Sequence, residues 1–195
     1  LATFLVAVYA FIAVILPLGS IVITSFMVSM SKGLSLDNFG FDAWIPVLEN
    51  SQYLDCIWRS LGYALIAATI GTILSLFVAY LSVKTHVKGR SLPDLLVMVG
   101  GSTPSVVIAL ALIITFSGNY GLNLYSTMWI LIVSYLVKYM TMSVRTIAAS
   151  LSQVSSSLEE AGLNSGAGWL RICKDIIMPL IAPSIVAGWF LIFMP

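Results

Sequence analysis

Long apolar stretches separated by short polar segments run along the whole chain. A helix needs about 20 predominantly apolar residues to cross a bilayer, and several of these stretches reach that length. We expect an all-α integral membrane protein, a polytopic helical bundle forming a single domain over residues 1–195. Both chain ends lie inside apolar runs, so we expect a fragment of a longer protein. The predicted membrane spans are residues 3–28, 58–83, 92–116, 127–147 and 179–195, the last of them truncated.

The composition supports a membrane location. Hydrophobic residues make up 59% of the chain and charged residues 9%, and the mean hydropathy is +1.04. A soluble domain carries about 25% charged residues, so this chain lacks the charge to cover a water-facing surface. The net charge of +1 provides none of the basic surface that nucleic-acid binding requires. We expect no nucleic-acid partner.

Basic side chains gather in two of the polar segments, 84–91 and 148–178. Short loops rich in Lys and Arg remain on the cytoplasmic side of a membrane. We therefore predict that both segments are cytoplasmic and that residues 29–57 and 117–126 face outward. The first of these outward segments carries the acids Asp37, Asp42, Glu49 and Asp55.

The most informative polar segment is 148–178. Ser157 and Glu160 have the spacing of a capping box at a helix start, and Gly166 is placed to end that helix. Beyond it, apolar residues with the spacing of one helix face predict a second, amphipathic helix. A helical hairpin that projects into water is therefore expected here. The residues of the amphipathic face are Trp169, Ile172, Cys173 and Ile176.

The order of residues in this hairpin closely resembles the EAA signature of permease subunits of binding-protein-dependent ABC importers. Glu160-Ala161-Gly162 is followed by three residues, Gly166, nine residues, and Ile176-x-Met178-Pro179. Two positions depart from the family pattern, with Gly162 in place of the second Ala and Met178 in place of Leu. The resemblance implies docking to an ATPase subunit through Glu159, Glu160, Ala161, Gly162, Gly166, Ile176, Met178 and Pro179.

The resemblance also implies an architecture and partners. The expected fold is that of a type I ABC importer permease with a cytoplasmic coupling helix, in a bacterial or archaeal inner membrane. The expected partners are an ATP-binding-cassette ATPase, an extracytoplasmic substrate-binding protein and a second permease unit, as a homodimer, a heterodimer or a fused half. The chain has no Gly-x4-Gly-Lys-Ser/Thr loop of the kind that cradles phosphates. We therefore expect the ATPase to bind ATP and Mg²⁺, and this chain to hold no cofactor or metal.

The substrate and the mode of energy coupling have several candidates. The sequence looks most like ferric-iron permeases, and permeases for phosphonate, polyamine, thiamine and sulfate are similar enough to compete. A secondary transporter driven by an ion gradient is a more distant alternative, disfavoured by the hairpin and by the shortage of acids in the spans. No paired carboxylates, Cys/His nucleophile or His-rich metal motif stands in the cytoplasmic segments, so we expect no enzyme.

Two features within the spans are candidates for the translocation path. The third span is interrupted at Gly100-Gly101-Ser102-Thr103-Pro104, and such breaks occur both at transport sites and where helices bend only to pack. Lys138 lies within the fourth span, where a charge is a functional candidate. Alternatively, Lys138 extends to the cytoplasmic surface together with Arg145. A further expectation is that Arg90 pairs with Asp94 four residues later. The residues assigned to the path are Ser102, Thr103, Pro104 and Lys138.

Overall fold

The computed structural model describes residues 2–118 and 120–194. In this part of the chain every regular element is helical, and the β-type pairings are isolated bridges between Met27 and Phe39 and between Ser117 and Asn123. The predicted all-α class is confirmed. Contacts group the chain into two units, Leu1–Arg59 and Ser60–Pro195. The single domain over residues 1–195 stays a prediction.

The first unit contains α1 (Ala2–Ser25), two 3-10 turns (Met30–Lys32 and Leu36–Asn38) and α2 (Ile45–Glu49). The first span ends at Ser25 rather than at residue 28 because the next backbone groups pair elsewhere. The Val28 amide donates to the Asn38 carbonyl oxygen (2.9 Å), and the Gly40 amide donates to the Phe26 carbonyl oxygen (2.9 Å).

Helix α3 (Ser51–Lys84) begins earlier than the predicted boundary at residue 58. The side-chain oxygen of Asn50 accepts a hydrogen bond from the Gln52 amide (2.9 Å), which satisfies a free donor at the helix start. Asp55 and Arg59 then form an ion pair at 2.8 Å, four residues apart. These local contacts make a polar stretch helical although its composition indicates a loop.

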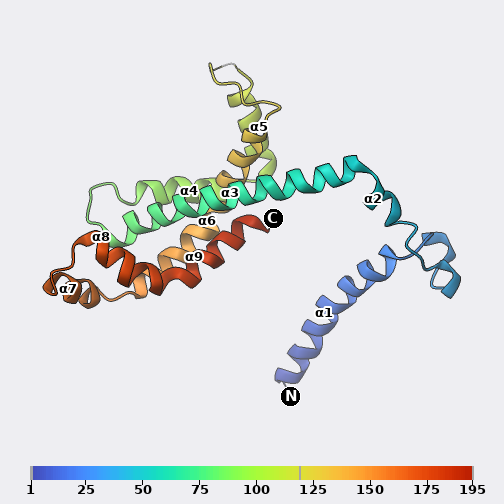
Figure 1. Cartoon of the computed structure of the whole chain (residues 1–195), viewed down its shortest axis with the longest axis horizontal. Coiled ribbons are helices and arrows are strands. Elements are labelled where there is room, and N and C mark those ends of the chain that lie inside the picture. The colour runs from blue at the N-terminus through green and yellow to red at the C-terminus, as the bar shows by residue number, and fades with distance from the viewer. Residues whose placement is uncertain (1, 119, 195) are drawn as a thin grey trace. The chain divides into compact units, whose positions relative to one another are not determined.

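The second unit is a layered packing of helices. Helices α6 (Met128–Gln153) and α9 (Met178–Phe193) lie side by side, and α4 (Leu92–Ser102) packs against α6 (Figure 1). The centre of the packing is a cluster of buried aliphatic side chains from α3, α6 and α9 and from the turns between α6 and α9. Its fully buried members are Ala79, Ile147, Leu151 and Ile181.

The predicted third span is two helices, α4 and α5 (Ser105–Phe116), and the chain bends by 111° between them. Figure 1 shows α5 turned away from α4. Proline disfavours helical backbone at the residue before it, and Thr103, which precedes Pro104, is extended with φ −75° and ψ 137°. The predicted interruption of the third span at Gly100-Gly101-Ser102-Thr103-Pro104 is therefore a sharp bend between two helices.

Two other boundaries differ from the prediction. Helix α6 extends six residues beyond the predicted end at residue 147, because Leu151 continues its buried apolar stripe. The last helical stretch begins before Pro179: α8 (Trp169–Ile172) runs through a π-helical turn (Cys173–Ile177) directly into α9. The described residues contain four helical stretches long and apolar enough to cross a membrane, or five if α4 and α5 count as one bent span.

Candidate functional site

The first arm of the hairpin is α7 (Ser156–Asn164), and its cap differs from the predicted one. Ser155 has extended backbone and its hydroxyl accepts a hydrogen bond from the Ser157 amide (3.3 Å). Ser157 therefore lies inside the helix, and the predicted capping box of Ser157 and Glu160 is wrong by two residues. Glu159 remains in the first turn, where the helix dipole favours a carboxylate.

The turn between the two arms is built around Gly166, as predicted. Gly166 has a φ of +79°, a region that glycine adopts without steric cost. Its amide donates to the Leu163 carbonyl oxygen (2.9 Å), and the Ala167 amide donates to the Gly162 carbonyl oxygen (3.1 Å). This pair of hydrogen bonds is the Schellman arrangement, so the end of α7 has a defined geometry.

The two arms of the hairpin touch at Gly162. A Cβ atom at this position would lie 2.9 Å from Ile172 Cγ1 and 3.2 Å from Ile176 Cδ1. The absence of a side chain therefore allows α7 to approach the second arm closely. Ile172 is buried and Ile176 half-buried, as expected for an apolar face. Trp169, on the same predicted face, is 56% exposed, and its indole N–H donates to the Tyr80 hydroxyl (2.9 Å).

An anchor that the sequence did not reveal holds the hairpin to the end of α3. Lys84 Nζ lies 2.6 Å from Glu159 Oε1 and donates to the Val154 carbonyl oxygen at 2.8 Å. The side chains of Lys84 and Glu159 are 11% and 26% exposed. Segments 84–91 and 148–178 therefore lie at the same end of the helical packing, as the distribution of basic residues predicts. Their cytoplasmic location stays a prediction.

A groove of about 540 Å³ runs along the hairpin. Of the predicted docking residues, Ala161, Gly162 and Ile176 line it. Glu159 lies in the Lys84 ion pair, Glu160 is exposed, Gly166 forms the turn, and Met178 and Pro179 begin α9. The full lining is Leu158, Ala161, Gly162, Ser165, Ala167, Arg171, Ile172, Asp175 and Ile176.

The break between α4 and α5 is bound by Lys138 of α6. Lys138 Nζ donates to the carbonyl oxygens of Thr103 (2.8 Å) and Gly101 (3.3 Å). The alternative in which Lys138 extends to the surface with Arg145 is therefore wrong. Arg145 Nη2 lies 3.4 Å from Asp94 Oδ2.

The predicted pairing of Asp94 with Arg90 is also wrong. Arg90 Nη1 instead donates to the Thr85 carbonyl oxygen within its own turn. Asp94 lies near the start of α4, and the packing of α4 on α6 brings it to Arg145. The pairing therefore depends on which helices are neighbours rather than on spacing along one helix.

Two further contacts fix the break against α6. The Thr141 hydroxyl donates to the Val97 carbonyl oxygen (2.7 Å), and a Cβ atom at Gly100 would lie 2.5 Å from the Val137 carbonyl oxygen. Small residues allow such close approach between membrane helices. The carbonyl groups of Gly101 and Thr103 at the break are met by the Lys138 side chain of this neighbouring helix, as a membrane interior requires.

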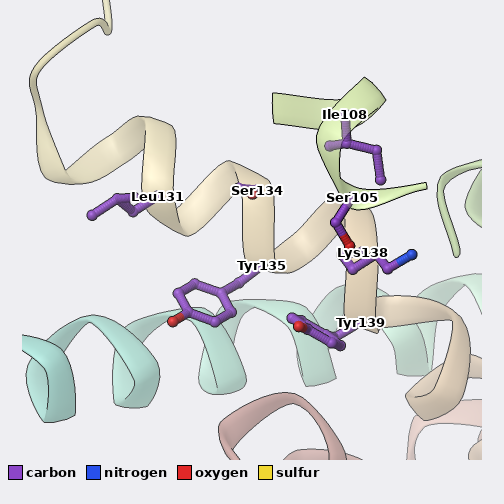
Figure 2. Close-up of a pocket in the computed structure, with 7 residues that line it drawn as sticks. All are labelled: Ser105, Ile108, Leu131, Ser134, Tyr135, Lys138 and Tyr139. Atoms are coloured by element: carbon purple, nitrogen blue, oxygen red, sulfur yellow. The ribbon is translucent and has the colours of Figure 1, made fainter. Parts of the chain in front are cut away.

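A cavity of about 200 Å³ lies beside the break, and Figure 2 shows the side chains around it. Lys138 lines it, as does Ser105 at the start of α5. The other predicted path residues, Ser102, Thr103 and Pro104, form the break itself and are not part of this lining. The remaining lining residues are Ile108, Leu131, Ser134, Tyr135 and Tyr139.

The described residues form an all-helical fold with membrane-length apolar helices and a projecting, capped hairpin, the arrangement expected of a transport permease. The family model for the binding-protein-dependent transport system inner membrane component matches residues 71–195. The chain belongs to this family, which confirms its resemblance to ABC importer permeases and its place in a bacterial inner membrane. The match covers both the hairpin and the break.

The proteins that the chain is similar to include an iron permease and a polyamine permease. The chain is 30% identical over 171 residues to the Fe(3+)-transport system permease protein FbpB 2 of Haemophilus influenzae, a match that covers 83% of this chain and 30% of that protein. It is 26% identical over 190 residues to the spermidine/putrescine transport system permease protein PotC of Escherichia coli K12, covering 97% of this chain and 70% of that protein. The chain thus spans about a third of the length of the iron permease.

Proposed function

We propose that the full-length protein is the membrane-spanning permease of an ATP-binding-cassette importer. It forms the translocation path and couples that path to ATP hydrolysis by a separate subunit. The observation that carries this proposal is the α7–α8 hairpin, which is rigidly held at its base and exposed along its outer side.

Rigidity follows from three contacts described above: the Schellman turn at Gly166, the close approach at Gly162 and the Lys84–Glu159 ion pair. Rigid-body transitions need elements that transmit movement without deforming. The outer side of the hairpin offers charge and apolar surface together, because Glu160 is exposed and Leu163 and Leu170 are 57% and 75% exposed. An ATPase groove that receives the hairpin would move α3, α8 and α9 as it closes.

The proposed partners follow from this role. An ATP-binding-cassette ATPase binds ATP and Mg²⁺ and receives the hairpin, and an extracytoplasmic binding protein delivers the substrate. A second permease unit completes the path, as a homodimer, a heterodimer or a fused half. This chain itself holds no cofactor in the proposed cycle.

We propose ferric iron as the transported element, supported by the similarity to the iron permease. A polyamine is the second candidate, supported by the match that covers 70% of the polyamine permease. The break with Ser102, Thr103 and Pro104, together with Lys138, is proposed to border the path.

The test is co-purification of the full-length protein with its ATPase, followed by uptake in proteoliposomes. Glu160→Lys is expected to abolish ATPase binding and the stimulation of ATP hydrolysis. Glu49→Lys, the same charge reversal at an exposed acid outside the hairpin, is the matched control and is expected to behave as wild type.

Two results would refute the proposal. One is a Glu160→Lys variant that binds and stimulates the ATPase like wild type. The other is uptake that an uncoupler abolishes while ATP is held constant, which would identify a gradient-driven transporter instead.

A further inference from the structure

The break between α4 and α5 places a fixed positive charge beside a cavity within the helical packing. The ammonium of Lys138 binds the carbonyl oxygens of Thr103 and Gly101. These groups belong to the C-terminal end of α4, which carries partial negative charge. A lysine ammonium has three N–H donors, so one donor remains after these two hydrogen bonds. The same side chain lines the cavity.

Neutral hydroxyl groups make up the rest of the polar lining. Ser105, Ser134, Tyr135 and Tyr139 surround the cavity together with Lys138 (Figure 2). Each hydroxyl can donate one hydrogen bond to an anionic oxygen. No carboxylate is among the residues that line this cavity, so no side chain of the lining offsets the lysine charge.

The start of α5 adds to this positive character. Helix α5 begins at Ser105, and the first amides of a helix have no acceptor within it. The N-terminal end of a helix therefore favours negative charge. The Lys138 ammonium is bound at the negative end of the neighbouring half-helix, so the positive end of α5 is not balanced by α4.

We propose that this cavity receives an anionic part of the transported substrate, such as a carboxylate or phosphate group, or a metal ion carried as a chelate of net negative charge. The inference rests on the proposed function, because it assigns a substrate class to the path. It favours iron in an anionic oxygen-ligand complex over a polyamine.

A cation would find poorer conditions here. The aromatic faces of Tyr135 and Tyr139, whose ring centroids are 5.9 Å apart, could attract a cation. A cation at these rings would share the cavity with the like charge of Lys138, and like charges repel. The nearest acid on α4, Asp94, is paired with Arg145. A polyamine site would need carboxylates that the described lining does not contain.

The experiment measures binding of two probes to the full-length permease, co-purified with its ATPase in lipid nanodiscs. The anionic probe is radiolabelled ferric citrate and the cationic probe is radiolabelled spermidine. Wild type is expected to bind ferric citrate and to show no saturable binding of spermidine. Lys138→Met is expected to weaken ferric citrate binding at least tenfold, and Lys138→Arg to retain most of it.

A second variant keeps the inference testable if Lys138→Met fails to fold. Ser134→Asp places a carboxylate in the cavity while keeping Lys138, and at four residues before Lys138 in α6 the added charge offsets that of the lysine. It is expected to lose ferric citrate binding at least tenfold. Ser152→Asp, the same substitution at an exposed position of α6 outside the cavity, is the matched control and is expected to bind ferric citrate as wild type does.

The outcomes separate this inference from the proposed function. Saturable binding of spermidine, binding of neither probe, or unchanged ferric citrate binding in Ser134→Asp would overturn the anionic site. Such results, with the ATPase still bound and stimulated, would leave the permease assignment standing. Loss of ATPase association in wild type would overturn both.

Discussion

Gly100 is the position at which a single methyl group should most directly test the packing of the broken span. A Cβ atom there would lie 2.5 Å from the Val137 carbonyl oxygen and 3.1 Å from Val137 Cγ1. The first contact is with backbone, which a rotamer change cannot relieve. Gly100→Ala must therefore push α4 away from α6.

Two opposing effects set the change in the free energy of unfolding for Gly100→Ala. Replacing Gly by Ala in a helix gains at most about 1 kcal/mol. Overpacking of a tight contact costs about 1–3 kcal/mol, and movement of α4 also lengthens the hydrogen bonds from Lys138 and Thr141, each worth about 1 kcal/mol. We expect the loss to exceed the gain, with a net destabilisation of about 1–3 kcal/mol.

The matched control is Gly62→Ala in α3, where a Cβ atom would meet nothing within 4 Å. This substitution is expected to be neutral or to stabilise by up to about 1 kcal/mol. Reversible unfolding of the two variants in mixed micelles, followed by loss of helical circular dichroism, provides the comparison. Equal free energies of unfolding for both variants would refute the close approach of α4 to α6.

Two further substitutions test the hairpin. Lys84→Met removes the charged partner of Glu159 and of the Val154 carbonyl, a loss of about 1–2 kcal/mol, and should speed amide hydrogen exchange of residues 154–164 about 5- to 30-fold. Lys88→Met, at an exposed lysine of the same segment, should leave the exchange rates unchanged. Equal exchange rates in both variants would contradict the anchoring role of Lys84. Gly166→Ala places a side chain at a φ of +79° and should destabilise the hairpin by about 1–2 kcal/mol, which co-purification would detect as weaker binding of the ATPase. Gly168→Ala, at a φ of −70° with open space around it, should bind the ATPase as wild type does. Equal ATPase binding by both variants would argue against a strained turn at Gly166.

Much of this protein follows from sequence alone, because the bilayer and the helix impose simple periodic rules. Apolar runs about 20 residues long predict the helical membrane fold. The sequence also predicted the hairpin, because a turn at Gly166 and an amphipathic helix after it depend only on residues close together in the chain. The family pattern from Glu160 to Pro179 identified the class of permease before any contact was known.

Contacts between distant segments could not be read in the same way. Lys84 and Glu159 are 75 residues apart, and Lys138 reaches carbonyl groups more than 30 residues before it. Pairing at such distances depends on which helices become neighbours. Local spacing instead favoured Arg90 as the partner of Asp94 and a surface position of Lys138 beside Arg145. The helix starts at Ser51 and Ser156 were missed because caps and ion pairs outweighed composition.

The sequence by itself therefore determined the helices, the membrane location and the hairpin, because each depends on residues close together in the chain. The tertiary structure decided that Pro104 creates a bend of 111°, that Lys138 binds the exposed carbonyl groups, and that a hydroxyl-lined cavity lies beside them. These properties arise only when α4, α5 and α6 pack together, since the charge and the groups that it meets come from different helices.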